Sequence, residues 1–80
     1  GTVAVGELDL HENWVGHRVT DLEAATGGRV AFVIRFGAGV LPDPRTVIQA
    51  GDQVYLAAAP GRAGQALAIA AQPPAEGTGE

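Results

Sequence analysis

The sequence contains no cysteine, no methionine, no lysine and no serine. The absence of cysteine excludes disulfides, thiolate chemistry and zinc sites with cysteine ligands. Serine is absent, and the threonines stand beside no base that would activate a hydroxyl, which argues against a nucleophilic hydrolase. We therefore expect a protein that is not an enzyme.

Long apolar runs and a basic surplus are missing as well. No run approaches the roughly 18 residues that span a bilayer, and no signal-peptide pattern opens the chain. The formal net charge is −4, with only five arginines, whereas nucleic-acid binding requires a basic footprint. We expect no membrane span in this sequence and no DNA or RNA partner.

What is present is sufficient for one small globular domain. The chain has 80 residues, of which 46% are hydrophobic. A chain of this size buries only about 60 to 65% of its unfolded surface, so it would gain from burying more against a partner. It begins without methionine, inside a strand-like pattern, and we expect it to be a piece of a longer protein.

The first half of the sequence predicts a strand, a loop, a short helix and a second strand. Residues 2–10 alternate as a strand, with a bulge expected near Gly6, where the apolar positions change face. Thr20 and Glu23 have the spacing of a capping box, and Gly27 and Gly28 supply a helix stop. In the strand at 29–36, the even-numbered residues are expected to face the core and the odd-numbered ones, including two arginines, the other side.

The second half predicts a hairpin, two turns, a strand and a helix. In order, these are a turn at 37–39, a strand at 40–41, turns at 43–45 and 50–52 around an extended 46–48, a strand at 53–58 and a helix at 60–71. The fold class is α/β (α+β): a small mixed or antiparallel sheet with a short helix after the first strand and a C-terminal helix. Residues 1–71 form the expected domain, and 72–80 a disordered tail.

Two groups of acidic or histidine residues are candidates for a chemical site. His11, Glu12 and His17 are the candidate metal ligands, but they lie on a loop, and surface or capping roles are favoured. Asp43 and Asp52 stand in turn sequences, where Asp ordinarily caps backbone amides. No metal site is predicted.

Three arginines form the strongest candidate for binding a small molecule. Arg29 and Arg35 are expected on one strand face, with Arg45 in a nearby loop, so that they could hold a phosphate group together. The competing interpretation, which we favour, is a solvated face whose arginines pair in part with Glu7, Asp9 or Asp43.

The order of four segments resembles a known family. Trp14–Leu22 stands where the family has leu-val-Gly-lys-thr-leu-x-x-leu, and Gly27–Arg35 is similar to its tGv-x-vvaI-R strand. Val40–Pro44 resembles iiPnp, and Thr46–Leu56 resembles t-x-l-x-x-GD-x-l-x-v. This is the pattern of the TrkA C-terminal domain, also called the RCK C-terminal domain, and the resemblance covers Thr2–Ala71.

The resemblance implies a cytoplasmic regulatory domain, peripheral to the inner face of the membrane. Its partners would be a second copy, forming a homodimer, and a membrane potassium transporter, channel or cation/proton antiporter subunit. It implies no cofactor in this domain, and cyclic di-AMP at the dimer interface as a candidate ligand. The alternative is a purely structural assembly domain of the same system that binds nothing.

The resemblance also implies where a ligand would bind: the end of the first helix, the start of the next strand and the following hairpin. Glu23 would repel a phosphate there, whereas Arg29 supplies positive charge. Together with Arg35 from the arginine group, the candidate ligand-binding residues are Leu22, Glu23, Gly28, Arg29, Val30, Arg35, Val40, Leu41 and Pro42.

Overall fold

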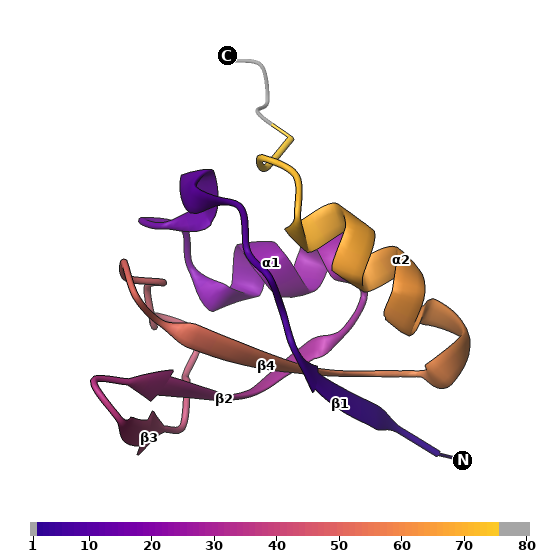
Figure 1. The fold of residues 1–80 in the computed structure, drawn as a ribbon, viewed down its shortest axis with the longest axis horizontal. Helices are drawn as coiled ribbons and strands as arrows, with labels where there is room; N and C mark the ends of the chain where they lie inside the picture. Colours follow the sequence, from indigo (N-terminus) through magenta and orange to yellow (C-terminus); the bar gives the residue numbers. More distant parts are fainter. Residues whose placement is uncertain (1, 76–80) are drawn as a thin grey trace.

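The computed structural model describes residues 2–75 and contains four strands, two α-helices and one short 3-10 helix (Figure 1). In chain order, the elements are β1 (Ala4–Glu7), η1 (Glu12–Trp14), α1 (Val19–Thr26), β2 (Arg29–Arg35), β3 (Ala38–Val40), β4 (Gln53–Ala58) and α2 (Pro60–Ala70). Every strand and helix expected from the sequence is present, except that residues 46–48 contribute only an isolated bridge between Val47 and Arg18.

The strands form one antiparallel sheet in the order β1-β4-β2-β3. Both helices lie on the same side of this sheet, and they contact one another (Figure 1). We call the helix-covered side the inner face and the opposite side the outer face. This arrangement confirms the predicted α+β class with a small antiparallel sheet.

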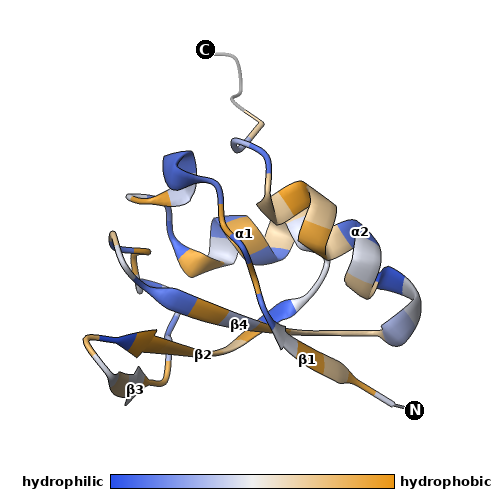
Figure 2. Cartoon of the chain, in the orientation of Figure 1, coloured by the Kyte–Doolittle hydropathy of each residue, from blue (hydrophilic) through white to orange (hydrophobic). Residues whose placement is uncertain are grey.

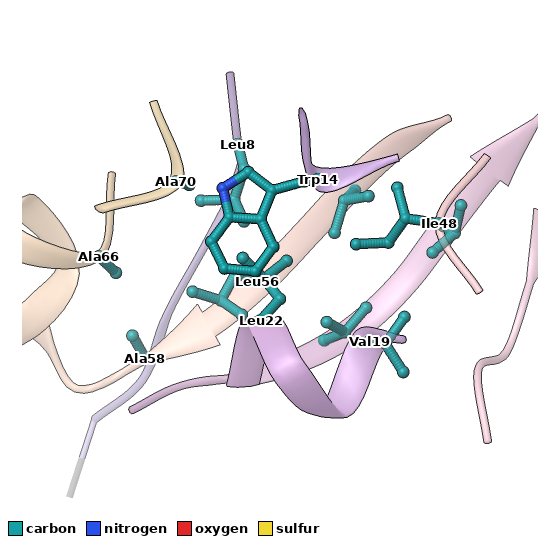
Figure 3. Packing of buried hydrophobic residues seen from close by; sticks show 12 residues of the cluster. Leu8, Trp14, Val19, Leu22, Ile48, Leu56, Ala58, Ala66 and Ala70 are labelled. Carbon is teal, nitrogen blue, oxygen red and sulfur yellow. The ribbon is translucent and has the colours of Figure 1, made fainter. Parts of the chain in front are cut away.

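The core fills the space between the inner face and the helices. Trp14 lies over it with 2% of its surface exposed, and Leu22 of α1 is fully buried (Figure 3). From β4, the alternate residues Val54, Leu56 and Ala58 face inward. Figure 2 shows hydrophobic segments in both helices and along the strands. Burial of Val19, Leu22 and Thr26, more than helix propensity, holds the eight-residue α1 in place.

A β-bulge lies in β2 and not in β1, contrary to the prediction. The pairing of β1 with β4 runs without a shift through Gly6, whereas β2 and β4 shift register between Val30 and Phe32. Ala31 is the extra residue. Because one extra residue exchanges the faces of all later residues, Val30 faces the core before the bulge and Val33 faces it afterwards.

Helix α1 begins two residues earlier than the predicted capping box would place it and is capped by different residues. Arg18 is the N-cap, and its backbone N–H donates to the Asp21 carboxylate at 3.3 Å. Thr20 and Glu23 therefore do not form the predicted capping box. The C-terminal end agrees with prediction: Gly27 adopts φ 78°, the left-handed conformation that glycine tolerates.

The hairpin between β2 and β3 turns on Phe36 and Gly37, and not on the predicted 37–39, because Arg35 pairs with Ala38. Both turn residues have positive φ, at 53° and 79°. The other two predicted turns are present. Asp43 Oδ1 accepts from the Arg45 N–H at 2.7 Å, and Asp52 Oδ2 accepts from the Gln49 N–H at 2.9 Å.

The chain remains packed beyond the predicted end of the domain. The Gln72 carbonyl accepts a hydrogen bond from the Trp14 indole at 2.8 Å, and Pro74 is buried. Residues 76–80 of the expected tail lie outside the described residues. Helix α2 buries Ala66 and Ala70, whereas Leu67 is 47% exposed. Among residues 2–75, neither helix has the length and apolar character needed to cross a membrane.

Candidate functional site

An open pocket of about 270 Å³ lies between α1, the first half of β2 and the loop that follows β3. Four of the predicted site residues line it: Glu23, Arg29, Val30 and Pro42. The rest of the lining is Val19, Thr20, Asp43 and Pro44. We call this the α1–β2 pocket.

The pocket exists because β3 is too short to cover β2. The three residues of β3 pair only with Val33–Arg35, so the first half of β2 has no strand beside it on that edge. An uncovered strand edge presents backbone donors and acceptors. Here the Glu23 carboxylate accepts the Val30 N–H at 2.8 Å and thus takes the place of a neighbouring strand.

The charges of the lining are one arginine and two carboxylates. Glu23 is half-buried and held by the Val30 N–H, and Asp43 is exposed. The Asp43 carboxylate is engaged in its own turn, where it accepts from the Arg45 N–H and the Thr46 hydroxyl. Arg29 is exposed at the rim. The pocket therefore combines apolar walls with the exposed Arg29 guanidinium and the Glu23 carboxylate, which is hydrogen-bonded to the open edge of β2.

The other predicted site residues lie apart from the pocket lining. Leu22 and Gly28 are buried beneath it, and a Cβ on Gly28 would meet the Ala57 carbonyl at 2.8 Å. Val40 is half-buried, and Leu41 is 85% exposed. These four support or flank the pocket without lining it.

The three arginines of the predicted anion site do not converge. Because of the bulge at Ala31, Arg29 faces outward whereas Arg35 faces inward, at the end of the buried side of the sheet. Arg35 makes two hydrogen bonds to Asp52, at 2.9 and 2.8 Å, and a third to the Val47 carbonyl at 3.1 Å. Arg45 is exposed and absent from the pocket lining. The expectation of a shared arginine face is therefore wrong.

The Arg35–Asp52 pair is structural. The Arg35 guanidinium holds the pKa of Asp52 below its usual range, with the Gln49 N–H adding to this, against the opposing effect of burial. In turn, Asp52 raises the pKa of Arg35. Both groups stay charged at neutral pH, and their hydrogen-bonding atoms are used on one another. Few donors or acceptors of the pair therefore remain for a ligand.

The two histidines serve local structure. His11 Nδ1 accepts from the Asn13 N–H at 3.0 Å, at the start of η1. His17 Nδ1 lies 3.5 Å from Asp21, and its ring meets Trp14 edge-on. Within residues 2–75, no three histidine or acidic side chains gather as metal ligands would.

Sequence reasoning missed four residues of the lining, although signals for them exist. Val19 and Thr20 precede Glu23 by four and three positions, which places them on the same helix face. Asp43 and Pro44 directly follow the predicted Pro42. What the sequence could not show is that the short β3 leaves an edge open beside α1.

The model of the TrkA-C domain family matches residues 5–71, which include both helices and all four strands apart from Ala4, the first residue of β1. The chain belongs to the TrkA-C domain family. It is also similar to the Trk system potassium uptake protein TrkA of Streptomyces coelicolor, with 45% identity over 56 residues. That alignment covers 70% of this chain and 25% of the relative, so the chain spans about a quarter of that relative's length.

Proposed function

We propose that this domain is a regulatory module of a potassium uptake system, sensing a small ligand in the α1–β2 pocket. The family match over residues 5–71 carries the proposal, and the relative named as a potassium uptake protein gives the transport system. The domain acts in the cytoplasm, next to a membrane transporter, channel or cation/proton antiporter subunit. It works as a homodimer, because a ligand regulates only by favouring one arrangement of the subunits over another.

The pocket supports ligand binding through its backbone edge. The Val30 N–H is held in place by the strand and donates a hydrogen bond to Glu23 Oε2 at 2.8 Å. The adjacent residue of the strand, Arg29, is exposed. An anionic ligand would displace the Glu23 carboxylate from the Val30 N–H and pair with Arg29. Cyclic di-AMP is the candidate ligand at the dimer interface, and Glu23 is the internal competitor that its phosphate must replace.

Titration calorimetry with cyclic di-AMP on three variants tests this proposal. Glu23→Gln should tighten binding, because it removes a like charge and weakens the bond that the phosphate must break. Arg29→Gln should weaken binding by about tenfold or more, since charge-assisted contacts are the strong ones. Arg62→Gln is the matched control, because Arg62 lies on α2 outside the pocket lining and loses the same charge.

A purely structural assembly domain is the second candidate. It is favoured by the charges of the pocket, where two carboxylates outnumber one arginine and Glu23 already satisfies the open edge. If neither the unmodified chain nor Glu23→Gln gives heat with cyclic di-AMP or other nucleotides at millimolar concentration, the sensing proposal fails and assembly remains.

A further inference from the structure

Strand β1 forms one edge of the sheet and hydrogen-bonds to β4 on one side only. The Leu8 N–H donates to β4 at 2.9 Å. Because the backbone groups of successive residues in an antiparallel strand point to opposite sides, those of Gly6 also face β4, whereas those of Val5 and Glu7 point away from it. In the part of the chain that the structure describes, no backbone group pairs with these outward donors and acceptors.

The two edges of the sheet differ in how far they are protected against an added strand. Short length, proline, bulges and charges are the usual means that block an edge. The opposite edge, β3, has only three residues, and Pro42 follows it closely. Strand β1 contains no proline, and its pairing with β4 has no bulge; its one charged side chain is Glu7. This edge is therefore open to a segment that complements that charge.

An apolar groove of about 140 Å³ lies between β1 and α2, and every residue of β1 lines it. We call it the β1–α2 groove. It exists because Ala4 and Gly6, which face inward, are too small to cover the side of α2. Leu67 of α2 is consequently 47% exposed, and a Cβ on Gly6 would meet nothing within 4 Å. Alternate side chains of a strand added to β1 would point into this groove.

The charges beside the β1–α2 groove are negative. Glu7 lines the groove, and Asp9 follows two residues later; both are exposed, and neither forms an ion pair within residues 2–75. No arginine lines the groove, and the whole chain has a net charge of −4. Opposite charges on neighbouring strands stabilise their pairing, whereas like charges oppose it. The edge therefore favours a segment with a basic residue.

We propose that β1 accepts an extended segment of another protein as an added edge strand, with a lysine or arginine opposite Glu7 and an aliphatic residue opposite Gly6. Main-chain hydrogen bonds to Val5 and Glu7 supply affinity, and the β1–α2 groove supplies selectivity. A second copy of this chain is a poor occupant, because its own β1 offers only the small Ala4 and Gly6 to the groove. The inference is independent of the ligand proposed above, since the α1–β2 pocket and this groove share no lining residue.

Titration calorimetry of the chain with the acetylated and amidated heptapeptide Thr-Val-Arg-Val-Thr-Val-Thr tests the proposal. Antiparallel pairing places its arginine opposite Glu7 and its central valine opposite Gly6. We expect saturable binding with a Kd below about 1 mM. N-methylation of the arginine amide, which faces β1, should abolish binding, because it removes a main-chain donor. N-methylation of the central valine, whose amide points to solvent, is the matched control and should leave binding intact.

Substitutions in β1 separate the groove from the charge. Gly6→Val fills the β1–α2 groove and should weaken peptide binding about tenfold or more. Gly39→Val is its matched control, because Gly39 also lies on an edge strand and a Cβ there also meets nothing within 4 Å. Glu7→Gln should weaken binding about two- to fivefold, the value of one cross-strand charge pair. Glu12→Gln, at an exposed residue outside the groove lining, should have no effect.

The N-methylated peptides test the edge with the unmodified chain, so the outcome does not depend on how a variant folds. No binding of the heptapeptide, or an equal loss from the two N-methylations, overturns the proposal. Equal effects of Gly6→Val and Gly39→Val overturn it as well. A chain that ignores the peptide but sediments at twice its 8.1 kDa mass, and returns to 8.1 kDa on Gly6→Val, assigns the edge to a second copy and also overturns it.

Discussion

Arg35 and Asp52 face one another at the end of the inner side of the sheet, with Nε to Oδ1 at 2.9 Å and Nη2 to Oδ2 at 2.8 Å. The Asp52 side chain is 1% exposed, whereas that of Arg35 is 22% exposed. The pair connects β2 to the turn that precedes β4, and Arg35 extends the connection to the Val47 carbonyl. A two-bond geometry of this kind is the strong form of an ion pair.

Asp52→Asn is therefore expected to destabilise the fold. It leaves the size of the side chain almost unchanged but removes the charge that balances Arg35. We expect the free energy of unfolding to fall by about 1 to 3 kcal/mol, measured by urea denaturation. Asp9→Asn, at an exposed position, is the control and should change stability by less than about 0.5 kcal/mol. Equal effects of the two substitutions would show that the pair contributes nothing.

The same pair predicts how stability depends on pH. The folded-state pKa of Asp52 is lowered, chiefly by the hydrogen bonds from Arg35. Its contribution is therefore complete above the unfolded pKa of about 3.9 and is lost as pH falls through the folded value. Urea midpoints should fall in this acid range, and Asp52→Asn should show a shallower fall than the unmodified chain. Parallel pH profiles for the two proteins would contradict the assignment.

The parts of the fold that depend on local signals could be predicted from the sequence. The alternation of apolar residues predicts β2 and β4, and the two glycines after α1 predict where that helix ends. The bulge at Ala31 could not be predicted, because nothing in the sequence of β2 marks which residue β4 leaves unpaired. That single residue puts Arg29 and Arg35 on opposite faces of the sheet, so the candidate arginine group, against which we favoured ion-paired arginines, does not form.

Long-range contacts account for the other differences. Glu23 has the right spacing for a capping box, but the open Val30 N–H on β2, seven residues away, binds it instead. Four of the nine candidate residues line the pocket, since the order of helix, strand and hairpin brings them together. The rest of the candidates share that neighbourhood in sequence but face the core or solvent.

Two glycine substitutions should have opposite effects on stability. A Cβ at Gly28 would lie 2.8 Å from the Ala57 carbonyl and 2.9 Å from the Leu56 side chain. Gly28→Ala should cost about 1 to 3 kcal/mol, because the backbone of β4 must move. Gly61 lies in α2 with open space around it, and Gly61→Ala should stabilise by about 0.5 to 1 kcal/mol. Thermal unfolding measures both, and a neutral Gly28→Ala would contradict the close approach.

Truncation after Ala71 should loosen the single tryptophan. The Trp14 indole donates to the Gln72 carbonyl at 2.8 Å, and the buried Pro74 follows. Without these residues, we expect a red shift of tryptophan fluorescence and a loss of about 1 kcal/mol, the net value of one hydrogen bond. Truncation after Ala75 keeps both contacts and should leave the spectrum unchanged. A spectrum unaltered by the first truncation would place the domain boundary at residue 71.

The hairpin tip contains backbone strain that a substitution should relieve. Phe36 has φ 53° and is 94% exposed, whereas two-residue turns of this kind favour Asn or Asp before glycine. Phe36→Asn removes the cost of a left-handed aromatic residue, and we expect a gain of about 1 kcal/mol in thermal unfolding. Gly37→Ala is the opposite change at φ 79° and should lose about the same amount. If Phe36→Asn lowers stability, the exposed ring must contribute a contact that outweighs its backbone strain.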